Sequence, residues 1–93
     1  MYLVLLTFAD KGRAGELMAA HNAWIARGFD DGVFLMVGSL QPSRGGAVLA
    51  HGTSRAALQH RVDDDPFVAH GVVNAEILEI APARTDARLA FLA

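Results

Sequence analysis

The sequence predicts an α+β fold in which one four-stranded antiparallel sheet carries two helices on one face. Four short segments rich in β-branched and aromatic residues alternate with two segments of helical periodicity, in the order strand, helix, strand, strand, helix, strand. The 93 residues are enough for one domain, and 53% of them are hydrophobic, which suffices for one core. We therefore expect a single domain.

The first half of the chain supplies two strands and a long helix. Residues 2–8 are apolar and β-branched and stop at Asp10, which is typical of a strand. Apolar positions then recur with a helical period over residues 13–29, and glycine-rich turn residues follow. Residues 33–40 form a second predicted strand, which is apolar on both faces.

The second half repeats the pattern with shorter elements. A loop over residues 41–46, in which Gly45 and Gly46 are expected to form a turn, leads to a third strand at 47–51. Ser54 is a good N-cap for a second helix at 54–64, and residues 72–80 form the fourth strand. We assign residues 1–82 to the domain and 83–93 to a C-terminal tail.

A histidine interrupts the apolar face of the first helix. That face recurs at i, i+3, i+4 and i+7, and we expect it to be buried. His21 in its centre either makes a structural hydrogen bond or lies at the floor of a pocket, and the spacing alone leaves both alternatives open. The positions that form this face are Ala14, Leu17, Met18, His21, Trp24, Ile25 and Gly28.

An aspartate follows the apolar side of the second helix. Pro66 disfavours the helical conformation at Asp65, so Asp65 ends one helix and is suited to cap a short turn after it. The predicted order of elements corresponds to the ferredoxin-like arrangement, in which the two helices run antiparallel. The end of the second helix then lies beside the first half of the first helix, so His21 and Asp65 can meet.

The other face of the predicted sheet also consists largely of apolar side chains. Two helices cover only one face, whereas the strands at 2–8 and 33–40 are apolar on both. A second copy of the same sheet is the simplest cover, so we predict a homodimer.

Composition excludes several classes of function. The formal net charge is −2 and the seven arginines are scattered, which argues against a nucleic-acid partner. The longest apolar run is far shorter than the ~20 residues of a membrane helix, and no secretory signal is recognisable, so we expect a cytoplasmic protein with no membrane partner. The chain has no cysteine, and its other histidines lack metal-ligand spacing. We expect neither metal nor cofactor.

The chain combines five motifs over nearly its whole length: His21, Gly38-Ser39-Leu40, Ser54-Arg55-Ala56-Ala57, Asp65-Pro66-Phe67 and Gly71. Together these motifs resemble the YciI-like (YCII-related) family. The resemblance implies a dimeric α/β-barrel fold and an active site built on His21 and Asp65. It also implies elimination of HCl from chlorinated hydroxyquinone-type compounds, or proton transfer on lactones as in related barrels. Family members often have a proline where this chain has Ser39.

The chemistry of a histidine–aspartate pair suits proton transfer. Histidine titrates near neutral pH, and a carboxylate on one ring nitrogen orients the other toward a substrate. Such catalysis contributes about 10²- to 10⁴-fold, so we expect a small activated ring as substrate. Trp24, Phe67, Met18 and Met36 are candidates for its lining, although Trp24 also suits the core, and Ser39 or the backbone N–H near Gly38 is a candidate for holding a substrate oxygen. A non-catalytic ligand-binding or regulatory module is the alternative.

Overall fold

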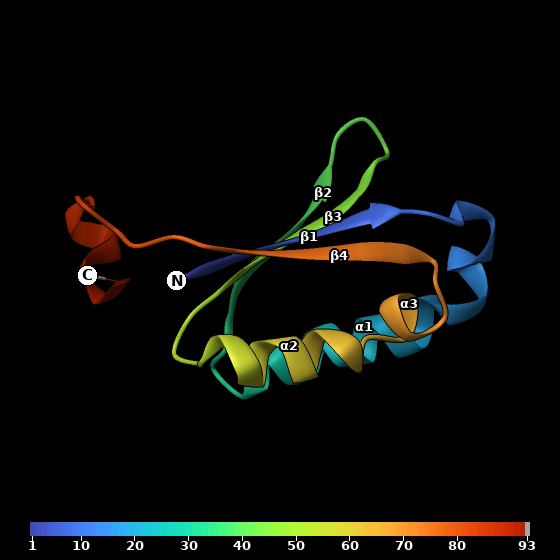
Figure 1. Ribbon diagram of the computed structural model, residues 1–93, viewed down its shortest axis with the longest axis horizontal. Helices are drawn as coiled ribbons and strands as arrows, with labels where there is room; N and C mark the ends of the chain where they lie inside the picture. Colours follow the sequence, from blue (N-terminus) through green and yellow to red (C-terminus); the bar gives the residue numbers. More distant parts are fainter. Residues whose placement is uncertain (93) are drawn as a thin grey trace.

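One antiparallel sheet and the helices on one of its faces make up the body of the protein (Figure 1). The computed structural model describes residues 1–92. The strand order is β2-β3-β1-β4, and each neighbouring pair is antiparallel. This is the predicted ferredoxin-like arrangement. The strands are β1 (Tyr2–Phe8), β2 (Phe34–Leu40), β3 (Gly45–Ala50) and β4 (Val73–Glu79), and the helices are α1 (Ala14–Asp30), α2 (Arg55–Asp63) and α3 (Pro66–Ala69).

The predicted element bounds agree with the structure to within one or two residues at most ends. A 3₁₀ turn, η1 (Lys11–Arg13), precedes α1, and a second one, η2 (Ala87–Leu92), lies in the tail. The prediction for Gly45 and Gly46 was wrong, because both residues belong to β3 and pair with Thr7 and Leu6 of β1.

The hydrophobic core lies between the sheet and the helices. Alternate residues of β1 point into it, and Leu58 and Val62 of α2 cover them from the helical layer. Gly28 of α1 lets the Phe34 ring approach, since a Cβ at this glycine would overlap that ring. Met18 is an exception to the predicted burial of the α1 face, because 42% of it is exposed.

The sheet face that the helices leave uncovered is apolar. Leu3 pairs with Leu49 on one side and with Leu78 on the other, so the three side chains share this face. Met36, opposite Leu49, is 57% exposed there. We call these four residues, with Leu5, the open-face patch.

A β-bulge decides which β2 side chains join this patch. The register between β2 and β3 shifts between Phe34 and Met36, which inserts one extra residue into β2. The shift turns Met36 to the open face, so the prediction that it lines the pocket was wrong. Val37 and Ser39 are turned toward the helices by the same shift.

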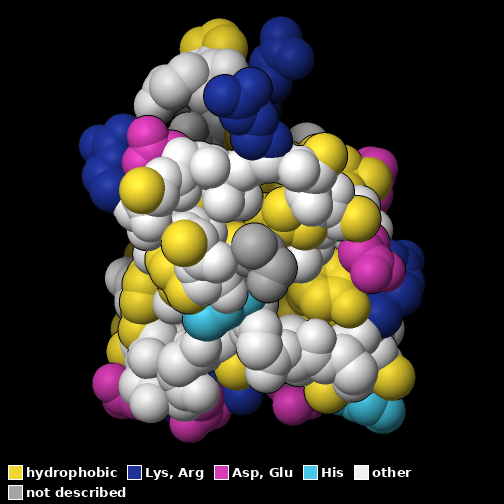
Figure 2. All heavy atoms as spheres, turned by 90° about the vertical axis from the view of Figure 1, so that its left-hand side faces the viewer, with side chains coloured by type: hydrophobic (Ala, Val, Ile, Leu, Met, Phe, Trp, Pro, Cys, Tyr) yellow, Lys and Arg dark blue, Asp and Glu magenta, His cyan; other side chains and the backbone are white. Residues whose placement is uncertain are grey.

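The C-terminal segment extends beyond the body of the molecule (Figure 1). Met1 and Ile80 exchange two backbone hydrogen bonds at its start, and the Phe91 ring packs edge-on against His51 with centroids 5.5 Å apart. Figure 2 views this end, where hydrophobic side chains lie exposed among charged ones. No helix within residues 1–92 has the length and apolarity needed to cross a membrane.

Candidate functional site

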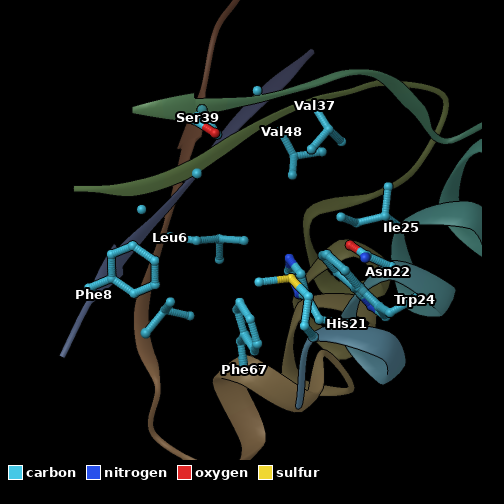
Figure 3. Close-up of a pocket in the computed structure, with 16 residues that line it drawn as sticks. Leu6, Phe8, His21, Asn22, Trp24, Ile25, Val37, Ser39, Val48 and Phe67 are labelled. Atoms are coloured by element: carbon cyan, nitrogen blue, oxygen red, sulfur yellow. The ribbon is translucent and has the colours of Figure 1, made fainter. Parts of the chain in front are cut away.

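A cavity of about 320 Å³ lies between α1 and the sheet (Figure 3). Such a volume is at the lower end of the range for ligand sites, so it suits a single-ring compound. Six of the eight residues predicted for the site line this cavity, Asp65 lies behind one of them, and Met36 lies on the other face of the sheet. The six are His21, Trp24, Gly38, Ser39, Phe67 and Met18.

His21 and Asp65 make the contact that the helix geometry predicts. His21 Nδ1 lies 2.7 Å from Asp65 Oδ1, while the Asp65 side chain is fully buried and that of His21 is 13% exposed. Asp65 Oδ1 also accepts a hydrogen bond from the Phe67 backbone N–H at 3.1 Å. Asp65 Oδ2 is buried and has no hydrogen-bond partner in the part of the chain that the structure describes.

Local sequence explains the position of Asp65. It has extended backbone angles (φ −61°, ψ 123°) immediately before Pro66, which occupies the first turn of α3. The carboxylate therefore caps α3 through the Phe67 N–H and contacts His21 with the same oxygen. The capping role and the histidine contact coexist in one side chain.

Two aromatic rings flank the imidazole. The Phe67 ring stacks on His21 with centroids 3.9 Å apart and planes 3° apart, and Trp24 stacks at 5.8 Å and 23°. Trp24 is itself anchored, because its Nε1–H donates to the Arg61 carbonyl at 2.8 Å. Phe67 and Trp24 thus both line the cavity and hold the imidazole plane. The sequence indicated a lining role for Phe67 and favoured core packing for Trp24, which is buried in the core and also lines the cavity. It did not indicate this stack.

The hydrogen bonds define what the histidine can do. Asp65 Oδ1 accepts from the Phe67 N–H, so an ionised Asp65 uses the same oxygen to accept from His21 Nδ1–H. Neutral His21 then has its lone pair on Nε2, on the other side of the ring. Since His21 lines the cavity, this arrangement can take up a proton from a bound molecule and return it.

Further polar and backbone groups line the cavity. Asn22, which the sequence analysis did not single out, lines it from α1 beside His21, and Ser39 lines it from β2 (Figure 3). Gly45 and Gly46 line it with backbone alone. A Cβ at Gly45 would overlap the Leu6 carbonyl oxygen, and its φ of 136° is strained for other residues. In the sequence, the consecutive glycines Gly45 and Gly46 were the signal that could have indicated this close approach of β3 to the Leu6 backbone.

No group of three or more His, Cys, Asp or Glu side chains arranged for a metal ion occurs in residues 1–92. His51, His60 and His70 lie on separate segments and line no part of the cavity.

The fold and the site together define a ferredoxin-like α+β protein with a histidine–aspartate pair beside a small, largely apolar cavity. The family model of the YCII-related domain matches residues 1–81, and the chain therefore belongs to the YCII-related family. No curated protein matches the chain.

Proposed function

We propose that this protein is a small cytoplasmic enzyme of the lyase or isomerase type, in which His21 and Asp65 catalyse proton transfer on an activated ring compound without a cofactor. The observation that supports this most directly is the 2.7 Å contact between His21 Nδ1 and the buried carboxylate of Asp65. Asp65 orients the imidazole, and Nε2 is the general base.

The proposed reaction is elimination of HCl from a chlorinated hydroxyquinone-type substrate. His21 Nε2 removes an acidic proton, the electron pair left behind forms the new double bond, and chloride leaves with the electrons of the C–Cl bond. The imidazolium then releases its proton to water. Proton transfer on an unsaturated lactone would use the same first step. Ser39 or the backbone N–H near Gly38 holds a substrate oxygen, and Trp24 and Phe67 contact the ring.

The family, the cavity and the pair support this proposal in different ways. The proposed chemistry came from a resemblance to the YCII-related family, and the model of that family matches residues 1–81, which is most of the chain. The cavity volume limits the substrate to a small molecule, and the stack with Phe67 limits rotation of the imidazole.

The test combines a substrate screen with one pair of variants. Purified protein is screened against chlorinated hydroxyquinones and unsaturated lactones, with chloride release and ultraviolet absorbance as readouts. We expect His21→Ala to lose at least about 10²-fold in kcat with substrate affinity within a few-fold of wild type. His60→Ala, on the exposed side of α2, is the matched control and keeps full activity. Binding of a screened compound by the wild type without any turnover, and its loss in His21→Ala, would favour a ligand-binding module instead.

We further propose that two copies associate through the open-face patch. This sheet face carries Leu3, Leu5, Leu49 and Leu78, and the chain's own helices lie on the opposite face. Sheets pack face to face over about 10 Å, and a two-fold axis brings the same patch of each copy together. The homodimer would thereby remove this apolar surface from water.

A further inference from the structure

We infer that the substrate is an anion, and that Lys11 selects it by attracting its carboxylate or phenolate to the Phe8 end of the cavity. The inference rests on the proposed function and adds the charge class of the substrate. It follows from three features of the described residues: the walls of the cavity, the position of Lys11, and the distribution of unpaired cations.

The cavity walls contain no group that would neutralise a charged substrate. None of the residues that line the cavity is Asp, Glu, Lys or Arg. His21 is the one ionisable side chain among these lining residues. The charge of a bound anion would therefore be recognised by a residue adjacent to the walls.

Lys11 is such an adjacent residue. Its Nζ lies 5.5 Å from the centroid of the Phe8 ring, and Phe8 lines the cavity. In Figure 3 Phe8 lies at the end of the cavity away from Trp24 and Ile25. The ammonium group sits at the end of a flexible four-carbon stem, so it can turn from the ring face to an anion beside it.

Other cationic residues are close to the same end. The Arg13 Nη1–H donates to the His70 carbonyl at 2.9 Å, and the Arg44 carbonyl accepts from the Phe8 N–H at 3.0 Å, which brings the β2–β3 loop next to Phe8. Neither arginine, nor Lys11, forms an ion pair with any carboxylate of residues 1–92. Asp10 is the adjacent carboxylate in the sequence. Three cationic residues of a chain of net charge −2 thus belong to the segments at this end.

Asp65 favours the same orientation of an anionic substrate. Its carboxylate lies behind His21, where it repels a second negative charge. The electrostatic energy of a bound anion is therefore lower when its charged group points toward Lys11 and its ring toward His21 and Phe67. This orientation brings the ring rather than the charged group to the proposed base.

Two probes of the same shape test the inference by binding alone. Benzoate is an anion and benzamide is its neutral isostere, and both are titrated into ¹⁵N-labelled protein at low salt. We expect benzoate to bind at least about fivefold more tightly than benzamide. The amide chemical shifts that benzoate changes should be those of Phe8, Gly45 and Gly46. Equal affinities for the two probes, or no binding of benzoate, would overturn the inference.

A pair of charge-removing variants assigns the effect to Lys11. We expect Lys11→Gln to lower benzoate affinity about three- to fivefold, to leave benzamide affinity unchanged and to weaken the salt dependence of benzoate binding. Arg88→Gln in η2, at the opposite end of the molecule from η1, removes the same charge and changes neither affinity (Figure 1). An equal effect of both variants, or of Lys11→Gln on both probes, contradicts the inference.

The two proposals fail separately. If His21→Ala abolishes turnover while benzoate and benzamide bind equally, the charge selection by Lys11 is wrong and the catalytic role of His21 stands. If benzoate selectivity depends on Lys11 while His21→Ala leaves kcat unchanged, the acid–base mechanism is wrong and the anion preference stands.

Discussion

Asp65 combines two contacts that ordinarily belong to different residues. It caps α3 through the Phe67 N–H, and it binds His21 through the same oxygen. The cap holds the carboxylate at the position where it contacts the histidine, and the Phe67 ring that follows stacks on the imidazole. Position and orientation of His21 therefore depend on three consecutive residues of the Asp-Pro-Phe motif.

The first prediction concerns the tautomer of His21. We expect its neutral imidazole to carry the proton on Nδ1, because the carboxylate of Asp65 accepts there. Long-range ¹H–¹⁵N spectra distinguish the two ring nitrogens directly. In Asp65→Asn the preference for Nδ1–H decreases, whereas the spectrum of exposed His60 stays the same. An unprotonated Nδ1 in the neutral wild-type ring would contradict the proposed orientation.

The second prediction separates capping from the histidine contact. We expect Asp65→Ala to lower the free energy of unfolding by about 1–3 kcal/mol, since it removes the cap and one buried hydrogen bond. Ser54→Ala, which removes only the cap that accepts from the Ala57 N–H, costs about 1 kcal/mol. Denaturant unfolding of both variants measures the difference. Equal losses would mean that the contact with His21 adds nothing to stability.

The third prediction concerns an exposed carboxylate in the tail. Hydrogen bonds from the Arg88 side chain and then from its backbone N–H hold the pKa of Asp86 below its ordinary value. A lowered pKa favours the folded state above the ordinary value, and the contribution disappears as the pH falls through the lowered one. In Arg88→Gln we expect the pKa of Asp86 to rise, as measured by carboxyl ¹³C shifts. An unchanged value would show that the η2 contacts do not persist in solution.

At the scale of elements, α1 packs closely against the sheet at one point and is free at another. Gly28 faces the Phe34 ring, whereas an added Cβ at Gly15 has no neighbouring atom within 4 Å. Both glycines belong to the same helix, so their intrinsic helix propensities are comparable. Any difference between alanine variants at these sites reports on packing.

The fourth prediction uses this matched pair. We expect Gly15→Ala to stabilise the protein by up to about 1 kcal/mol, because alanine lowers the entropy of the unfolded chain and favours the helix. Gly28→Ala destabilises it by about 1–3 kcal/mol, because its Cβ overlaps Phe34 and the core must shift. Thermal and denaturant unfolding provide the values. Stabilisation by both substitutions would contradict the close packing at Gly28.

The β-bulge in β2 decides which side chains of this strand line the cavity. By adding one residue between Phe34 and Met36, it reverses which side chains of β2 face α1. Ser39 enters the cavity lining and Met36 leaves it. The sequence of β2 alone does not decide whether Met36 or Val37 faces the helices, since the strand is apolar on both faces.

At the scale of the whole molecule, the two faces of the sheet have different roles. One face holds the core and the cavity, and the other presents the open-face patch to solvent in a single copy. An exposed apolar surface of this kind commonly marks an association site. The proposed dimer would use it without obstructing the helical layer.

The fifth prediction tests that association with two methionines on opposite faces. We expect wild-type protein to have the mass of a dimer in light scattering, and Met36→Lys to shift it toward the monomer, because a charge would be buried in the patch. Met18→Lys makes the same change on exposed Met18 of α1 and leaves the mass unaltered. A monomeric wild type, or equal effects of the two variants, would contradict the proposed interface.

Much of the site was predictable because its signals are local. The apolar period of α1 located His21, and the Pro66 rule located Asp65 at an extended, capping position. Topology then brought the two together, since the order of elements determines which helix ends are neighbours. The family match over residues 1–81 agrees with the motifs that carried the resemblance.

The sequence by itself determined the order of the elements and the ferredoxin-like fold, because periodicity, capping and turn chemistry act over a few residues. That order in turn indicated that His21 and Asp65 can meet, since it sets which helix ends are neighbours. Only the tertiary structure decided the bulge, the stack of Phe67 on His21, and the place of Asn22 and of the Gly45 and Gly46 backbone in the cavity lining. These features depend on strand register and on contacts between distant segments, whose energies no short window of sequence contains.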